Sequence, residues 1–188
     1  MKNTFFIIAL ILCFCACHEK PDNSAQLKFE ENSKTVMAML KAWETETPDY
    51  SVFADDVVIR ETGFGAEKDS FGLEEMKEQN KRSLAALDFK LLGDPVMLPG
   101  VNPDTKMPDG SVRYYGDWEV TRTATDSTEA KSGVLRVYHS FDFNDDGKIV
   151  YEQMYADFTG LMNHLWGPRP VMADDAGEAV EEATEESE

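Results

Sequence analysis

Apolar and polar residues alternate along Ser111–Thr125, which is the pattern of a β-strand with one buried face. The apolar face would carry Val112, Tyr114, Gly116, Trp118 and Val120, and the polar face Arg113, Tyr115, Asp117, Glu119 and Thr121. Gly116 removes a side chain midway along the apolar face. Its position indicates a bend, a bulge or space for another group.

Two more strands, Val134–Phe143 and Lys148–Phe158, are rich in Val, Ile, Tyr and Phe, which suit a pleated, half-buried surface. Between them, Asn144-Asp145-Asp146-Gly147 ends in the Asp-Gly pair that is common at hairpin turns. The stretch predicts a long antiparallel hairpin. The inward face of its second strand stays open between two sets: Tyr151, Gln153, Tyr155 and Asp157, or Val150, Met154 and Phe158.

Helical spacing appears in three places. From Ala25 to Glu46 an apolar stripe predicts a helix that Pro48 ends, and it consists of Phe29, Val36, Leu40 and Trp43. Leu73–Leu87 predicts a second helix, and Thr159 to Trp166 a short third one. Of the remaining stretches, Val57–Glu61 and an interrupted Phe89–Leu98 read as strands, and Pro99–Gly110 as an irregular loop.

The order of these elements predicts an α+β fold, with a curved antiparallel sheet wrapped around the N-terminal helices. Residues 26–166 suffice for one domain. The flanking segments are a polar tether at 18–25 and, at 167–188, a tail that reads as disordered because it is strongly acidic and lacks a hydrophobic period.

Residues 1–17 read as a targeting segment, because one Lys precedes an apolar run too short to span a bilayer. Ala16 and Cys17 then resemble the cleavage site of a bacterial lipoprotein signal, in which the Cys after the cut is acylated. The alternative is an ordinary secretory signal. Since all three Cys lie at positions 13, 15 and 17, no disulfide is expected in the mature protein. The predicted location is the bacterial cell envelope, on the outer membrane or the periplasmic face.

The chain carries 36 acidic and 18 basic residues, a formal charge of −18. Nucleic acid would be repelled, and no basic stripe offsets this, so nucleic-acid binding is excluded as a function class. Surface charge would not attract anionic lipids either. Membrane association would therefore rest on the lipid anchor at Cys17.

Three features resemble the nuclear-transport-factor-2-like superfamily, SnoaL-like branch: Phe53-Ala54-Asp55-Asp56-Val57-Val58, the helix that starts at Gly72, and Gly147-Lys148-Ile149-Val150 followed by Tyr155-Ala156-Asp157. The resemblance covers about residues 32–165 and rests mostly on element order. It implies a cone-shaped, cystatin-like roll with an apolar pocket, and a homodimer formed through the outer face of the sheet. SnoaL-like cyclases carry Glu-His-Trp-Asp where this chain has Glu152-Gln153-Met154-Tyr155, which argues against cyclase activity.

Candidate chemistry centres on Asp157 and Tyr138. Asp157 matches a common position of the family and could act as a base in the pocket, with Tyr138 as the polarising donor; the alternative for Asp157 is to cap the helix that follows. His139 is the one His inside a predicted strand, where a packing role is the default. The predicted ligand pocket comprises Tyr114, Trp118, Tyr138, Tyr151 and Tyr155, with core packing as the alternative for each.

The spacing of Asp142, Asn144, Asp146 and Gly147 matches a calcium loop, but Gln153 occupies the position of its bidentate Glu. Chance is the better explanation in so acidic a chain. No metal or other cofactor is predicted. The favoured function is a non-catalytic module that binds a small, largely apolar molecule, and the alternative is an isomerase, hydratase or hydrolase that uses Asp157 and Tyr138.

Overall fold

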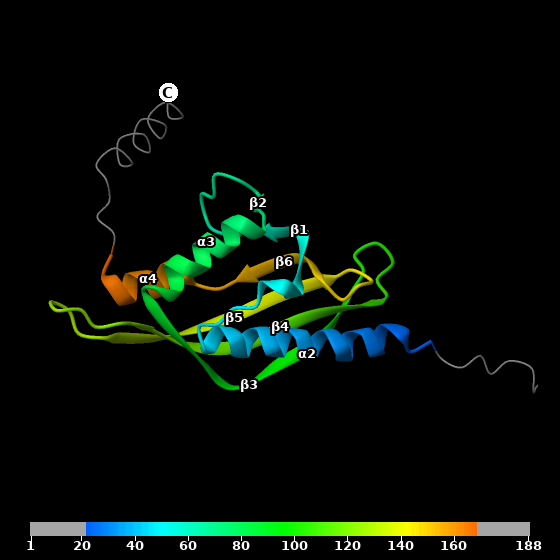
Figure 1. Ribbon diagram of the computed structural model, residues 1–188, viewed down its shortest axis with the longest axis horizontal. Coiled ribbons are helices and arrows are strands. Elements are labelled where there is room, and N and C mark those ends of the chain that lie inside the picture. Colours follow the sequence, from blue (N-terminus) through cyan, green and yellow to red (C-terminus); the bar gives the residue numbers. More distant parts are fainter. Residues whose placement is uncertain (1–21, 169–188) are drawn as a thin grey trace, which may run out of the picture.

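The computed structural model describes residues 22–168 (Figure 1). In chain order the elements are α2 (Ser24–Glu44), η1 (Tyr50–Val52), β1 (Phe53–Arg60), β2 (Ser70–Phe71), α3 (Leu73–Leu84), β3 (Leu87–Val101), β4 (Pro108–Arg122), β5 (Lys131–Phe143), β6 (Ile149–Tyr155) and α4 (Phe158–Trp166). The predicted signal with Cys17 and the acidic tail beyond Pro168 lie outside the described residues. None of the helices described has the length and apolar character to cross a membrane.

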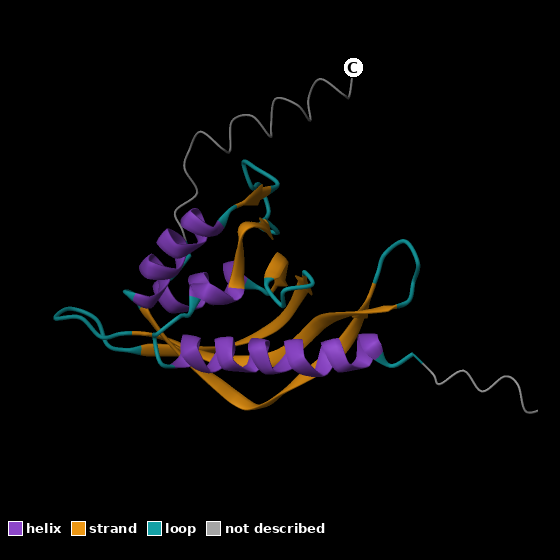
Figure 2. Ribbon diagram, turned by 45° about the vertical axis from the view of Figure 1, so that its right-hand side comes forward, coloured by secondary structure: helices purple, strands orange, loops and turns teal. Residues whose placement is uncertain are grey.

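The six strands form one sheet in the order β2-β1-β6-β5-β4-β3, and the sheet bends around α2 (Figure 2). The predicted α+β class and curved sheet are confirmed. One detail differs from an all-antiparallel sheet, because β1 pairs with β6 in parallel. Short turns force consecutive strands to run antiparallel, whereas β1 reaches β6 through α3 and four further strands, so no turn fixes their relative direction.

Helix α2 packs on β4 and β3 with the predicted stripe. Val36 and Leu40 are buried, and Phe29 and Trp43 pack against the core from its edge. Asn32 lies on the same stripe and is also buried. Its Nδ2 donates a hydrogen bond to the carbonyl of Gly110 at 2.9 Å, which satisfies the buried amide. The helix begins at Ser24, slightly inside the predicted tether.

Strand β3 is longer than predicted. Helix α3 ends at Leu84, and β3 then continues through the stretch that was expected to begin the irregular loop, with Pro99 paired to Val112. β3 is an edge strand, and a proline is tolerated there because the missing N–H need not bond to a neighbour. The predicted interruption near Gly93 is confirmed as a shift in register between Leu92 and Val96.

The predicted hairpin of β5 and β6 is confirmed, with Asn144 organising the turn. Its side-chain oxygen accepts hydrogen bonds from the backbone N–H groups of Asp146 and Lys148, at 3.1 and 2.9 Å. Gly147 has a φ of +71°, which favours glycine. Strand β6 ends at Tyr155, so Phe158 begins α4 instead of ending the strand.

The register shift in this hairpin sets which side chains of β6 face inward. Phe143 pairs with Ile149, but Asp142 pairs with Tyr151, so β6 has one extra residue, Val150, at this point. Such a β-bulge reverses the alternation of faces beyond it. Ile149 is buried on the inner side, and past the bulge the even-numbered residues Glu152 and Met154 face inward.

The predicted apolar face of β4 is also confirmed, and Gly116 provides space for Tyr114. A Cβ at position 116 would lie 2.2 Å from the hydroxyl of Tyr114, whose ring is folded back over the glycine. We expect Gly116→Ala to destabilise the protein by about 1–3 kcal/mol, because the buried ring must move. Urea unfolding measures the change.

Gly72→Ala is the control, because a Cβ there meets nothing within 4 Å. Its cost should be clearly smaller than that of Gly116→Ala. Equal costs for the two substitutions would contradict the close approach of Tyr114.

Candidate functional site

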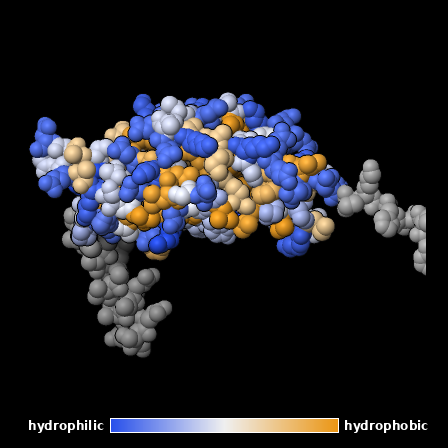
Figure 3. All heavy atoms as spheres, turned by 90° about the horizontal axis from the view of Figure 1, so that it is seen from below, coloured by the Kyte–Doolittle hydropathy of each residue, from blue (hydrophilic) through white to orange (hydrophobic). Residues whose placement is uncertain are grey.

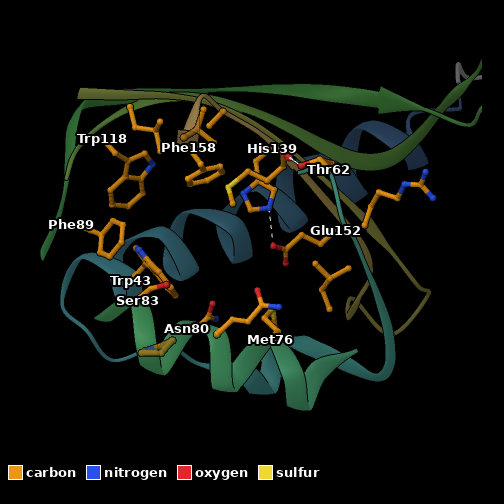
Figure 4. A pocket seen from close by; sticks show the side chains of 18 of the residues that line it. Trp43, Thr62, Met76, Asn80, Ser83, Phe89, Trp118, His139, Glu152 and Phe158 are labelled. Atoms are coloured by element: carbon orange, nitrogen blue, oxygen red, sulfur yellow. Dashed lines mark hydrogen bonds and ion pairs between the residues drawn. The ribbon is translucent and has the colours of Figure 1, made fainter. Parts of the chain in front are cut away.

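A cavity of about 670 Å³ lies between the inner face of the sheet and helices α2 and α3 (Figure 4). Aromatic side chains dominate its walls: Trp43, Tyr50, Phe53, Phe71, Phe89, Tyr114, Trp118 and Phe158. Its size and apolar lining are typical of small-molecule pockets. Phe64 stands at the rim on a glycine-flanked loop and is fully exposed.

One end of the cavity is aromatic. Trp43 from α2 meets Phe89 from β3 edge to face, with 5.3 Å between ring centroids, and Trp118 lies beside them (Figure 4). The indole Nε1 of Trp118 donates to the hydroxyl of Tyr114 at 2.7 Å. Burial raises the pKa of Tyr114 to about 12, so this phenol stays protonated at neutral pH.

A polar pair lies on the inner face farther along the sheet. His139 Nε2 and Glu152 Oε1 are 2.9 Å apart, and their side chains are only 11% and 12% exposed. The His139 ring packs against Phe141, with 4.2 Å between centroids. A buried carboxylate requires such a partner, because desolvation without one is costly.

Helix α3 closes the cavity opposite the pair. Met76, Asn80 and Ser83, spaced four and three residues apart, share the helix face that points into the cavity (Figure 4). The wall facing Glu152 is therefore partly polar. The sequence predicted this helix, but not that Asn80 and Ser83 face the cavity.

Two of the five predicted pocket tyrosines and tryptophans, Tyr114 and Trp118, do line the cavity. The prediction is wrong for Tyr138, Tyr151 and Tyr155, which lie on the outer face of the sheet. Tyr138 pairs with Tyr155 across the strands, one residue away from the row of His139 and Met154 that lines the cavity. The bulge at Val150 is the physical reason why Tyr151 and Tyr155 of β6 point to the outer face and not into the cavity.

On the outer face these tyrosines form a cluster of their own. Tyr138 packs between Tyr115 and Tyr155, with centroid distances of 5.0 and 6.4 Å. The hydroxyl of Tyr151 donates to Gln153 at 2.7 Å, and Gln153 donates to the hydroxyl of Tyr155 at 2.6 Å. Tyr138 is thus on the wrong face to act with a group in the cavity.

Asp157 is the N-cap of α4, as its capping interpretation predicted. Its Oδ1 accepts a hydrogen bond from the backbone N–H of Gly160 at 2.7 Å. The residue borders the cavity, but it is not brought together with Tyr138. The proposed pair of Asp157 and Tyr138 therefore has no common site.

The sequence reasoning missed the pair of His139 and Glu152. A signal was present, because His139 interrupts an otherwise apolar face formed by Leu135, Val137 and Phe141. A polar residue on such a face requires a buried partner. Nothing in the sequence identified Glu152 as that partner, since its face depends on the bulge.

Across residues 22–168 no three His, Cys, Asp or Glu side chains are grouped as a metal site would require. The residues with calcium-loop spacing have other contacts. Asn144 holds the turn, and Asp142 forms an ion pair with Arg113 at 2.9 Å.

No family model matches the sequence, and no curated protein matches it either. Solved structures do match. A candidate polyketide cyclase from Silicibacter sp. TM1040 superimposes with a TM-score of 0.55 at 19% identity, over 71% of this chain and 94% of that protein. One from Xanthomonas campestris pv. campestris gives 0.55 at 17%, over 73% and 98%.

A protein with a different description also matches in shape. AclR, a candidate hydroxylase from Streptomyces galilaeus, gives a TM-score of 0.51 at 14% identity, over 83% of this chain and 98% of AclR. A nuclear-transport-factor-2-like protein from Burkholderia xenovorans LB400 gives 0.52 at 12% identity, over 72% of this chain and 96% of that protein, so the chain has the nuclear-transport-factor-2-like fold. Because the identities are low, these matches show a shared fold only, and they do not assign the activity of those proteins to this chain.

The capping role of Asp157 leads to a stability prediction. Asp157→Ala should cost about 1 kcal/mol of unfolding free energy, because the N–H of Gly160 loses its acceptor, whereas Asp157→Asn should retain most of the stability. Thermal or urea unfolding measures both. A loss in Asp157→Asn as large as that in Asp157→Ala would contradict capping by the side-chain oxygen.

Proposed function

We propose that this protein binds a small, largely apolar molecule in the cavity of its SnoaL-like domain. The observation that carries the proposal is an aromatic-lined space of about 670 Å³ with one buried polar pair at its wall. An apolar body would replace water against the aromatic walls, and a polar group on it would meet His139 or Glu152.

A second candidate is an enzyme that uses the same pair for proton transfer. His139 and Glu152 lie within hydrogen-bond distance in a mostly apolar site, an arrangement suited to general acid–base catalysis. The fold is shared with proteins described as candidate cyclases and hydroxylases. If this holds, Glu152→Gln abolishes turnover of a bound ligand while its affinity is largely retained.

Filling the cavity tests the binding proposal. Ser83→Trp places an indole into the space from α3, and we expect it to weaken binding of the neutral dye Nile red about tenfold or more. Fluorescence titration measures the affinity. Arg82→Trp is the matched control, because the neighbouring side chain is exposed and the dye should bind unchanged. Failure of the unaltered protein to bind would overturn the proposal, as would equal affinity in the two variants.

We also propose that the protein is anchored in the bacterial cell envelope by acylation of Cys17, which the small residue before it and the short apolar run support. Mass spectrometry of the mature N-terminus should find Cys17 as its first residue with acyl chains attached. Cys17→Ser should shift the protein to the soluble fraction. An unmodified Cys17 in the mature protein would contradict the anchor.

Two copies are proposed to pair through the outer face of the sheet. Exposed apolar side chains gather there around the tyrosine cluster: Val58, Val96, Leu98, Tyr115, Val134 and Tyr155. When the molecule is viewed from below its orientation in Figure 1, its surface shows apolar patches between charged groups (Figure 3). Such a patch suits a self-complementary dimer.

Light scattering at micromolar concentration should give a dimeric mass, with Tyr155→Asp monomeric. Phe64→Asp, which changes an exposed loop residue, should leave the dimer intact.

A further inference from the structure

The charged groups around the cavity are nearly all acidic. Among residues 22–168, four carboxylates line it, from Asp49, Glu61, Glu152 and Asp157, and Arg60 is the only Lys or Arg in the lining. The Arg60 side chain is 47% exposed and its guanidinium reaches toward Asp69 at 4.0 Å. In the part of the chain that the structure describes, no other Lys or Arg lines the cavity, and Arg60 turns toward Asp69.

Three of the four carboxylates are engaged by the backbone next to them. Asp49 accepts from the N–H of Ser51, Glu61 from those of Thr62 and Gly63, and Asp157 from that of Gly160. These bonds satisfy the acids as turns and caps. Glu152 has no such backbone donor among the described residues.

Glu152 uses only one of its two oxygens. Oε1 meets His139, while Oε2 has no hydrogen bond to any residue between 22 and 168, and the carboxylate points into the cavity toward helix α3 (Figure 4). Oε2 is not among the buried side-chain atoms without a hydrogen-bond partner, so it opens into the cavity, where a donor on a ligand can reach it in place of water.

The neighbouring walls favour the same kind of ligand. The faces of Trp43, Trp118 and Phe158 carry negative electrostatic potential and attract cations at short range. The chain's net charge of −18 raises the local concentration of cations around the protein. A ligand with a carboxylate group would be repelled by Glu152, by the aromatic faces and by the net charge of the protein.

We propose that the ligand of this cavity is a protonated amine on an aromatic or polycyclic apolar body, with its ammonium group donating to Glu152 Oε2. The inference rests on the proposed binding function and specifies its ligand class. The apolar body then extends toward Trp43, Phe89 and Trp118. A neutral alcohol can donate to Glu152 but lacks the charge, and an acid lacks both the donor and the sign.

Three probes with one ring system test this: naphthylethylamine, naphthylethanol and naphthylacetic acid. Calorimetry is carried out on the full chain at about pH 8, above the range in which imidazole side chains ordinarily gain a proton. We expect the amine to bind about tenfold more tightly than the alcohol, with the acid weakest. Glu152→Gln should weaken the amine about tenfold and the alcohol less than about threefold.

Glu119→Gln is the matched control, because Glu119 lies on the outer face of the sheet, and it should leave all three affinities unchanged. Raising the salt to about 0.5 M screens the distant charges, and the preference for the amine should survive since the contact is buried. Equal binding of amine and acid, a preference unchanged in Glu152→Gln, or one abolished by salt would overturn the inference. Nile red separates the two proposals: if the dye binds and the amine does not, only the ligand class is wrong.

Discussion

The one extra residue in β6 decides what the cavity contains. Without the bulge at Val150, the pairing of Phe143 with Ile149 would continue down the hairpin, and Tyr151, Gln153 and Tyr155 would face the cavity. With it, Glu152 and Met154 face the cavity. A bulge costs a ladder hydrogen bond, and such irregularities concentrate where a strand has to re-aim a side chain.

The bulge has consequences on both sides of the sheet. Inside, Glu152 comes within 2.9 Å of His139, although the two residues belong to different strands and are joined only by the hairpin. Outside, the displaced Tyr155 joins Tyr138 and Tyr115 in one row across three strands. The polar pair of the cavity and the aromatic patch of the opposite face are thus two results of one register shift.

The sequence was sufficient for the parts of the fold in which residue types differ sharply between faces. Ser111–Thr125 places charges on one side and apolar groups on the other, so the buried side of β4 could be predicted, along with Tyr114 and Trp118. The Asp146-Gly147 turn, the stripe of α2 and the cap at Asp157 follow from local chemistry in the same way.

The rest depended on interactions between strands. In β6 both alternating sets mix apolar and polar groups, and tyrosine suits either face because it has an apolar ring and a polar end. The pattern therefore could not decide between Tyr151 and Glu152. The prolines of β3 likewise read as loop residues until β3 is known to be an edge strand, which only the pairing of the whole sheet establishes.

The charge of the site follows from the same geometry. Had the tyrosine set faced inward, the cavity would offer neutral hydroxyls to either a donor or an acceptor. Glu152 instead brings a carboxylate into an aromatic space, and His139 occupies only one of its oxygens. Desolvation strengthens the attraction of that carboxylate for a cation and its repulsion of an anion, so a single buried group can set the sign of the ligand more firmly than the many exposed acids of the surface.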